Sequence, residues 1–286
     1  MRKVVRVVAC QNRLGEGPLW HPDEKALYWV DIEGKKIQRY YPVSGKYEAF
    51  DTPLRVTLLA FRENGGAVCA TENGFHFWER ETNAFTFISD PEAGKEGARF
   101  NDGKSDRAGR LWAGTMRPSD ATSALYRMDA DLSVRKILDG ITISNGIGWS
   151  PDNRTMYYVD SLRYVMYVFD YDLASGAATN QRPFLELDAD YGTPDGLTVD
   201  SQGYVWCAIY GGWKVIRIDP TGEICEEVPM PVSQPSSCMF GGKNLDTLFI
   251  TSISDGIEDP AKEPMAGDLF ALKPGVEGLP EARFAG

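Results

Sequence analysis

The same strand pattern recurs six times along this chain, at intervals of 40 to 49 residues. Each copy is a short run of apolar, aromatic and β-branched residues, and the copies start at positions 27, 67, 111, 156, 205 and 248. A second strand pattern follows several of them, as in Lys36–Tyr41 and Val165–Asp170. Almost no segment has helical periodicity. A period of about 40–50 residues made of several strands is typical of a β-propeller, in which each unit forms one blade. The six runs are Leu27–Ile32, Ala67–Thr71, Leu111–Thr115, Met156–Asp160, Val205–Ile209 and Leu248–Ser252.

We therefore predict an all-β fold, a six-bladed β-propeller with four-stranded antiparallel blades that occupies residues 1–286 as a single domain. Val4–Cys10 has strand character and precedes the first unit, so we expect it to pair into the last blade and close the ring. A β-sandwich or barrel with accidental regularity is the alternative, and the near-constant spacing disfavours it.

A polar residue lies ten or eleven positions before each run. These six ring residues are Glu16, Thr57, Asn101, Asn145, Asp195 and Ser237. The positions just before the innermost strands of a propeller converge on the central channel at one face, so we expect the six side chains to share a small volume. The alternative is ordinary turn chemistry, because Asn-Gly and Asp-Gly pairs are common in turns.

The residue types at these positions favour oxygen ligands over histidine chemistry. The chain has 41 Asp and Glu but only 2 His, and it has no G-x-S-x-G or H-E-x-x-H motif. We expect both His21 and His76 to be structural or solvent-exposed. Glu16, Asn145 and Asp195 supply the oxygen ligands that Ca²⁺, Mg²⁺ and Mn²⁺ prefer. Two carboxylates on the channel axis would repel each other unless a cation lay between them.

Five segments in and around these positions carry distinctive motifs. They are Leu14–Trp20, Arg99–Lys104, Gly109–Met116, Ile143–Asp152 and Pro194–Asp200. In this order they resemble the senescence marker protein/gluconolactonase/luciferin-regenerating family of regucalcin-like proteins and sugar lactonases. The resemblance extends from about residue 10 to the C-terminus.

The resemblance implies a six-bladed propeller with one divalent cation at the channel mouth, held by Glu16, Asn145 and Asp195. Ca²⁺ is the first expectation for this cation, and Zn²⁺, Mn²⁺, Mg²⁺ and Fe are alternatives. Arg99 and Asn101 fall on residues that contact the substrate, and Asp195 is the candidate catalytic base. The implied reaction is metal-dependent hydrolysis of a sugar (aldono-) lactone to the aldonic acid, with either Asp195 or a hydroxide on the cation activating the water.

One loop departs from the family. Some relatives carry a substrate-contacting Glu after the Gly-Thr-Met motif, whereas Arg117–Ser123 is short and has no Glu. The details of sugar preference therefore do not carry over. Two other functions stay open: a non-catalytic propeller that binds a divalent cation for regulation or interaction, and an esterase for organophosphates or aryl esters.

Charge and hydropathy set expectations for partners and location. The net charge of −11 repels phosphate backbones, so nucleic acid is not an expected partner. No run of 18 apolar residues occurs, and residues 1–10 lack the apolar stretch of a signal peptide. The five cysteines lie far apart and form no CxxC pair. We expect a cytoplasmic protein with no membrane partner, a small-molecule sugar lactone as substrate, and a monomeric or weakly homo-oligomeric state.

Overall fold

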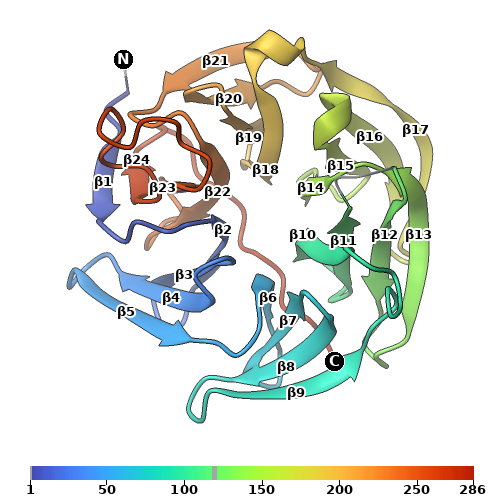
Figure 1. Ribbon diagram of the computed structural model, residues 1–286. Helices are drawn as coiled ribbons and strands as arrows, with labels where there is room; N and C mark the ends of the chain where they lie inside the picture. The colour runs from blue at the N-terminus through green and yellow to red at the C-terminus, as the bar shows by residue number, and fades with distance from the viewer. Residues whose placement is uncertain (1, 118–120) are drawn as a thin grey trace.

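The computed structural model describes residues 2–117 and 121–286, and in these ranges it contains six antiparallel sheets of four strands. The sheets are arranged around a central axis as the blades of a propeller (Figure 1). The predicted six-bladed all-β fold is confirmed. Two short 3₁₀ helices, η1 (Ser161–Arg163) and η2 (Ala189–Tyr191), lie between strands. Within the described ranges, no helix has the length and apolar character needed to cross a bilayer.

The blades follow one another along the chain. Blades one to three consist of β2 (Gly15–His21), β3 (Ala26–Asp31), β4 (Lys36–Tyr41) and β5 (Lys46–Asp51); β6 (Val56–Phe61), β7 (Ala67–Thr71), β8 (Gly74–Glu79) and β9 (Ala84–Ser89); and β10 (Arg99–Ser105), β11 (Leu111–Met116), β12 (Ser123–Met128) and β13 (Val134–Ile141). Blades four to six consist of β14 (Ser144–Trp149), β15 (Thr155–Asp160), β16 (Val165–Asp172) and β17 (Ala177–Glu186); β18 (Thr193–Val199), β19 (Val205–Tyr210), β20 (Lys214–Ile218) and β21 (Ile224–Pro229); and β22 (Pro235–Gly241), β23 (Thr247–Ser252), β24 (Leu269–Leu272) and β1 (Val5–Val8).

The N-terminal strand closes the ring. β1 pairs antiparallel with β24, with Val5 opposite Ala271 and Arg6 opposite Phe270. The sixth blade therefore combines strands from both ends of the chain (Figure 1), and the prediction for Val4–Cys10 is confirmed. This closure joins the two ends of the chain through backbone hydrogen bonds and gives the sixth blade its fourth, outermost strand.

The hydrophobic core lies between the blades and not on the axis. Six buried clusters each combine side chains from two neighbouring blades. In one of them the rings of Trp206 in β19 and Phe240 in β22 meet with their centroids 6.3 Å apart. Because neighbouring blades stack face to face, β3 is buried along its whole length and is apolar at nearly every position. This stacking leaves the innermost strands free to present polar groups to the axis.

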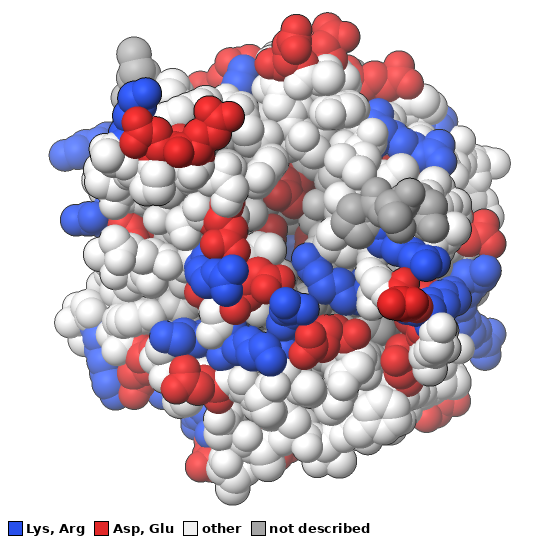
Figure 2. All heavy atoms as spheres, viewed as in Figure 1, with Lys and Arg blue, Asp and Glu red and all other residues white. Residues whose placement is uncertain are grey.

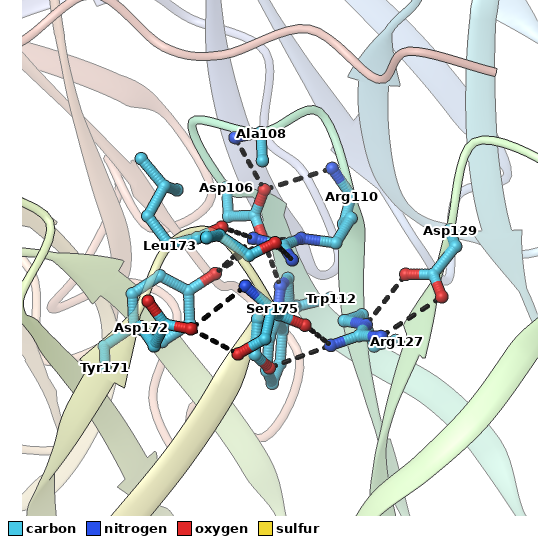
Figure 3. A network of polar contacts seen from close by, with 12 residues as sticks. Asp106, Ala108, Arg110, Trp112, Arg127, Asp129, Tyr171, Asp172, Leu173 and Ser175 are labelled. Atoms are coloured by element: carbon cyan, nitrogen blue, oxygen red, sulfur yellow. Dashed lines mark hydrogen bonds and ion pairs between the residues drawn. The ribbon is translucent and has the colours of Figure 1, made fainter.

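A buried polar network joins blades three and four (Figure 3). The carboxylate of Asp106, directly after β10, accepts hydrogen bonds from Arg110 Nε at 2.7 Å, Trp112 Nε1 at 2.8 Å and the Tyr171 hydroxyl at 2.6 Å. It also accepts two backbone N–H groups of the turn that follows β10. Asp106 is completely buried, and its full set of partners fixes the end of β10 against the next blade.

The C-terminal segment, residues 274–286, crosses the ring at the end where the innermost strands finish (Figure 1). Backbone hydrogen bonds tie it to four blades: Ser201 N to Glu277 O, Gly278 N to Leu245 O, Phe284 N to Phe61 O, and Ala285 N to Gly109 O. The Phe284 side chain is fully buried in the cluster between blades two and three. Lys104 at the end of β10 lies 3.4 Å from Glu281, measured between Nζ and Oε1. Nothing in the sequence of this segment predicted its path.

Candidate functional site

The six ring residues lie inside the innermost strands, and the expectation that they precede these strands was wrong. The runs from which they were counted are the second strand of each blade. An innermost strand such as β10, with the sequence RFNDGKS, faces a polar channel and therefore lacks an apolar run. The regular pairing of each innermost strand breaks at or beside its ring residue, and β-bulges of this kind redirect side chains next to functional sites. The breaks fall between Glu16 and Leu19, Val56 and Leu58, Phe100 and Gly103, Ser144 and Ile147, Pro194 and Leu197, and Pro235 and Ser237.

Two carboxylates from the ring and a third beside it share one part of the channel. Glu16 and Asp195 are only 8% and 6% exposed. Burial, and then the Asp102 carboxylate, raise the pKa of Glu16 to about 8. Burial, and then Glu16 and Asp102, raise the pKa of Asp195 well above its usual range. Carboxylates influence one another in this way only when they are close together, so the channel gathers acidic groups whose repulsion Arg99 offsets only in part.

Two other ring residues have different surroundings. The Thr57 hydroxyl donates to the Ala70 carbonyl within blade two, at 3.2 Å. Ser237 lines a small cavity of about 20 Å³ together with Asp102 and Glu281. This volume has room for about one water molecule. We therefore expect neither Thr57 nor Ser237 to bind a substrate.

The buried acids fit a divalent cation. Asp195 Oδ1 is buried and has no hydrogen-bond partner in the described part of the chain, which is costly for a carboxylate oxygen. A cation would satisfy this oxygen and offset the repulsion between Glu16 and Asp195. Among the described residues, no three Asp, Glu, His or Cys side chains form a ligand group. A cation would therefore combine the two carboxylates with an amide oxygen, and Asn145 is the residue predicted for this role.

Arg99 and Asn101 adjoin this candidate metal centre. Arg99 Nη1 donates to Asn101 Oδ1 and to the Phe100 carbonyl, each at 2.8 Å. Asn101 Nδ2 in turn donates to Asn145 Oδ1 at 3.0 Å. Burial lowers the pKa of Arg99 to about 10, although the nearby carboxylates, including Glu16, oppose this effect. The predicted substrate-contacting residues thus form a continuous group with a predicted metal ligand.

Paired charges lie beside Arg99. Arg55 forms ion pairs with Glu33 at 3.0 Å and with Glu72 at 3.3 Å. All three of these residues influence the pKa of Arg99. Figure 2 shows acidic and basic side chains gathered around the central hollow of the ring. Arg55 is already paired with two carboxylates. Of the two arginines beside each other here, Arg99 is therefore the one that remains to face a ligand.

Sequence reasoning missed three residues near the site. Asp102 directly follows Asn101, and in a regular strand two neighbouring side chains point to opposite sides of the sheet. The bulge after Phe100 interrupts this alternation, so both side chains act in the channel. The Ser161 hydroxyl accepts a hydrogen bond from Asn145. Tyr210 lies near Asp195. Burial, and to a lesser extent the Asp195 carboxylate, raise the pKa of the Tyr210 phenol. Asp102 alone had a sequence signal, as a carboxylate inside the same motif as Asn101.

Two further expectations concern residues outside the site. His21 Nδ1 accepts a hydrogen bond from the backbone N–H of Glu24 at 3.2 Å, and the buried His76 contacts the Thr71 hydroxyl. Both histidines have the structural surroundings that were expected. The departure predicted for Arg117–Ser123 falls partly on residues 118–120, which lie outside the described residues.

Cation-free protein is expected to lose thermal stability as the pH rises from about 5 to about 8. Glu16 has a pKa of about 8 in the folded protein against an ordinary 4.5, so the folded state retains a proton that the unfolded chain releases. The resulting stability is fully present below the unfolded pKa and is lost as the pH rises through the folded pKa. Melting temperatures measured in chelator test this, and Glu16→Gln should reduce the slope, while Asp195, whose pKa is also raised, keeps part of it. A chelated parent whose stability is constant or rises over this interval would contradict the assignment.

Comparisons with known proteins agree with the fold and the motifs. The family model described as SMP-30/Gluconolactonase/LRE-like region matches residues 14–254. Regucalcin of Gallus gallus is 39% identical over 295 residues, which covers 99% of each chain. The structure of the calcium-binding protein regucalcin from Agrobacterium tumefaciens superposes with a TM-score of 0.95 at 26% identity, covering 99% of this chain and 97% of that one. A luciferin-regenerating enzyme superposes with a TM-score of 0.93 at 29% identity, over 100% of both chains. The chain therefore belongs to the SMP-30/gluconolactonase/LRE-like family.

Proposed function

We propose that this protein hydrolyses sugar lactones to aldonic acids with the help of one divalent cation, Ca²⁺ in the first instance. The observation that carries the proposal is the unpartnered, buried Asp195 oxygen among like charges, in a chain of a gluconolactonase-like family. Glu16, Asn145 and Asp195 would hold the cation. When bound, a divalent cation supplies Lewis-acid polarisation of the lactone carbonyl and stabilises negative charge on its oxygen.

Asp195 is the proposed base. The carboxylate oxygen that is not bound to the cation accepts a proton as the water oxygen forms a bond to the carbonyl carbon, and the ring C–O bond then breaks. The departing ring oxygen takes up the proton that Asp195 had accepted and becomes the hydroxyl group of the aldonic acid, which returns Asp195 to its basic form. Burial raises the pKa of Asp195, which strengthens it as a base, whereas a neighbouring cation acts in the opposite direction.

Arg99 and Asn101 are the proposed substrate contacts. The hydrogen bonds of Arg99 within the described residues use Nη1, which leaves the rest of its planar guanidinium for the hydroxyl groups of a sugar. Asn101 is held between Arg99 and Asn145, so it would orient a substrate directly beside the metal ligand.

A pH-indicator assay on a panel of five- and six-membered aldonolactones tests the proposal. An aryl acetate and an organophosphate triester belong in the same panel, with buffer alone to correct for spontaneous hydrolysis. We expect at least one aldonolactone to be hydrolysed, with slower or no turnover of the other esters. A response equal to buffer across all lactones would contradict a lactonase.

The second candidate is a propeller that binds a divalent cation without catalysis. It is favoured by one observation, the description of the Agrobacterium relative as a calcium-binding protein. Cation binding together with a flat response across the panel would support this function and replace the first.

A further inference from the structure

A directed chain of hydrogen bonds runs through three blades beside the candidate metal centre. It starts at Arg99 Nη1, which donates to Asn101 Oδ1 at 2.8 Å. Asn101 Nδ2 donates to Asn145 Oδ1 at 3.0 Å, and Asn145 Nδ2 donates to Ser161 Oγ at 2.8 Å. The Ser161 hydroxyl donates to the Pro194 carbonyl at 2.7 Å. The chain thus links β10 and β14 to β18, and it ends on the residue that precedes Asp195.

The two ends of this chain fix the direction of every bond in it. A guanidinium group can only donate and a carbonyl oxygen can only accept. Asn101 must therefore turn its oxygen to Arg99 and its nitrogen to Asn145. Ser161 has given its one proton to Pro194, so it must accept from Asn145. The orientation of the Asn145 amide, which is ordinarily ambiguous by 180°, is set by Ser161 on one side and Asn101 on the other.

The hydrogen bond from Asn145 to Ser161, which orients the Asn145 amide, is shielded from water. Ser161 is 2% exposed and Asn145 is 7% exposed. Ser161 opens the 3₁₀ helix η1, and its backbone N–H donates to the Ile143 carbonyl, which precedes β14. Its hydroxyl therefore occupies a fixed position between β14 and β18. Without that hydroxyl, the Asn145 nitrogen would have no hydrogen-bond partner among the described residues, and only the bond from Asn101 to Asn145 Oδ1 would still favour this orientation.

We propose that Ser161 is a positioning residue for the candidate metal centre, because it presents the Asn145 oxygen to the cation and ties Asn145 to the strand that carries Asp195. This inference rests on the proposed cation site. Partners that orient metal ligands typically change metal affinity by about 10–100-fold when they are removed. We expect Ser161→Ala to weaken Ca²⁺ binding by about tenfold or more, while Ser161→Thr, which keeps a hydroxyl, retains most of the affinity.

A double-mutant cycle separates positioning from general loosening of the fold. Asn145→Asp gives the side chain two equivalent oxygens. Either oxygen can contact the cation, so the side chain does not have to be held in one orientation. We expect Ser161→Ala to reduce Ca²⁺ affinity at least about tenfold in the parent but less than about threefold in the Asn145→Asp background, as measured by titration calorimetry. Equal losses in both backgrounds would overturn the proposal. The matched control is Ser252→Ala, which removes a buried hydroxyl that donates to the Asp268 carbonyl at 2.7 Å and should leave affinity unchanged.

A second readout does not depend on metal. In cation-free protein, the side-chain NH₂ signals of Asn145 should exchange slowly with solvent in NMR spectra, and exchange should accelerate in Ser161→Ala. Equal exchange rates in the two proteins would overturn the positioning role. A parent that binds no divalent cation would overturn the proposed metal centre instead, and the exchange measurement keeps these two failures apart.

Discussion

Asp195→Asn is expected to reduce lactone hydrolysis by about 10²–10⁴-fold, the usual contribution of a general base. The substitution keeps the shape of the side chain but removes both its negative charge and its basic oxygen. Cation affinity should fall as well, because an amide is a weaker ligand than a carboxylate for a hard cation. Steady-state rates on the best lactone of the panel, with cation affinity measured in parallel, provide the test.

The stability of this variant distinguishes a lost function from a lost fold. In chelator, Asp195→Asn should melt at or above the temperature of the parent near pH 8, because it removes one of the mutually repelling buried carboxylates. Asp190→Asn is the matched control, since Asp190 is an exposed carboxylate in η2, directly before the same strand. Activity of Asp195→Asn within threefold of the parent would rule out its role as base and ligand.

Phe284→Ala is expected to lower the free energy of unfolding by about 3–5 kcal/mol, the usual cost of removing a fully buried phenylalanine ring. Phe284 is 0% exposed and fills the cluster between blades two and three, so its loss leaves a cavity and frees the C-terminal segment. For a chain of this size, the melting temperature should fall by roughly 6–20 °C. Thermal and urea denaturation measure both quantities.

The control for this prediction is Phe87→Ala, because Phe87 in β9 is 59% exposed. The same chemical change at that position should alter stability by less than about 1 kcal/mol. Equal losses for the two variants would show that the C-terminal segment does not contribute to the core of the ring.

The sequence predicted the blades because the second strand of each unit is buried on both sides. Runs such as Leu27–Ile32 must be apolar to fill the space between blades, and this makes their spacing visible. Innermost strands such as Arg99–Ser105 were passed over, since the channel allows polar residues and glycine there. The six ring positions could nevertheless be picked out, because each lies ten or eleven residues before the start of a visible strand.

The unpredicted parts depend on contacts between segments that are distant in sequence. Ser161 has no motif of its own, and its role follows only from its bonds to Asn145 and Pro194. Phe284 lies in a segment without strand periodicity, and its burial results from pairing with a turn more than 200 residues earlier. Asp102 was hidden by strand alternation, which the bulge in β10 interrupts.

The dependence of lactone hydrolysis on one bound cation is tested by following bound metal and hydrolysis in the same samples. Chelated protein is titrated with Ca²⁺, Zn²⁺, Mn²⁺, Mg²⁺ and Fe²⁺ in separate series, and bound metal and hydrolysis rate are recorded at each step. Activity should be absent without metal, rise in proportion to bound cation and saturate at one cation per chain. Full lactonase activity after exhaustive chelation, or a rate unrelated to bound metal, would contradict this dependence.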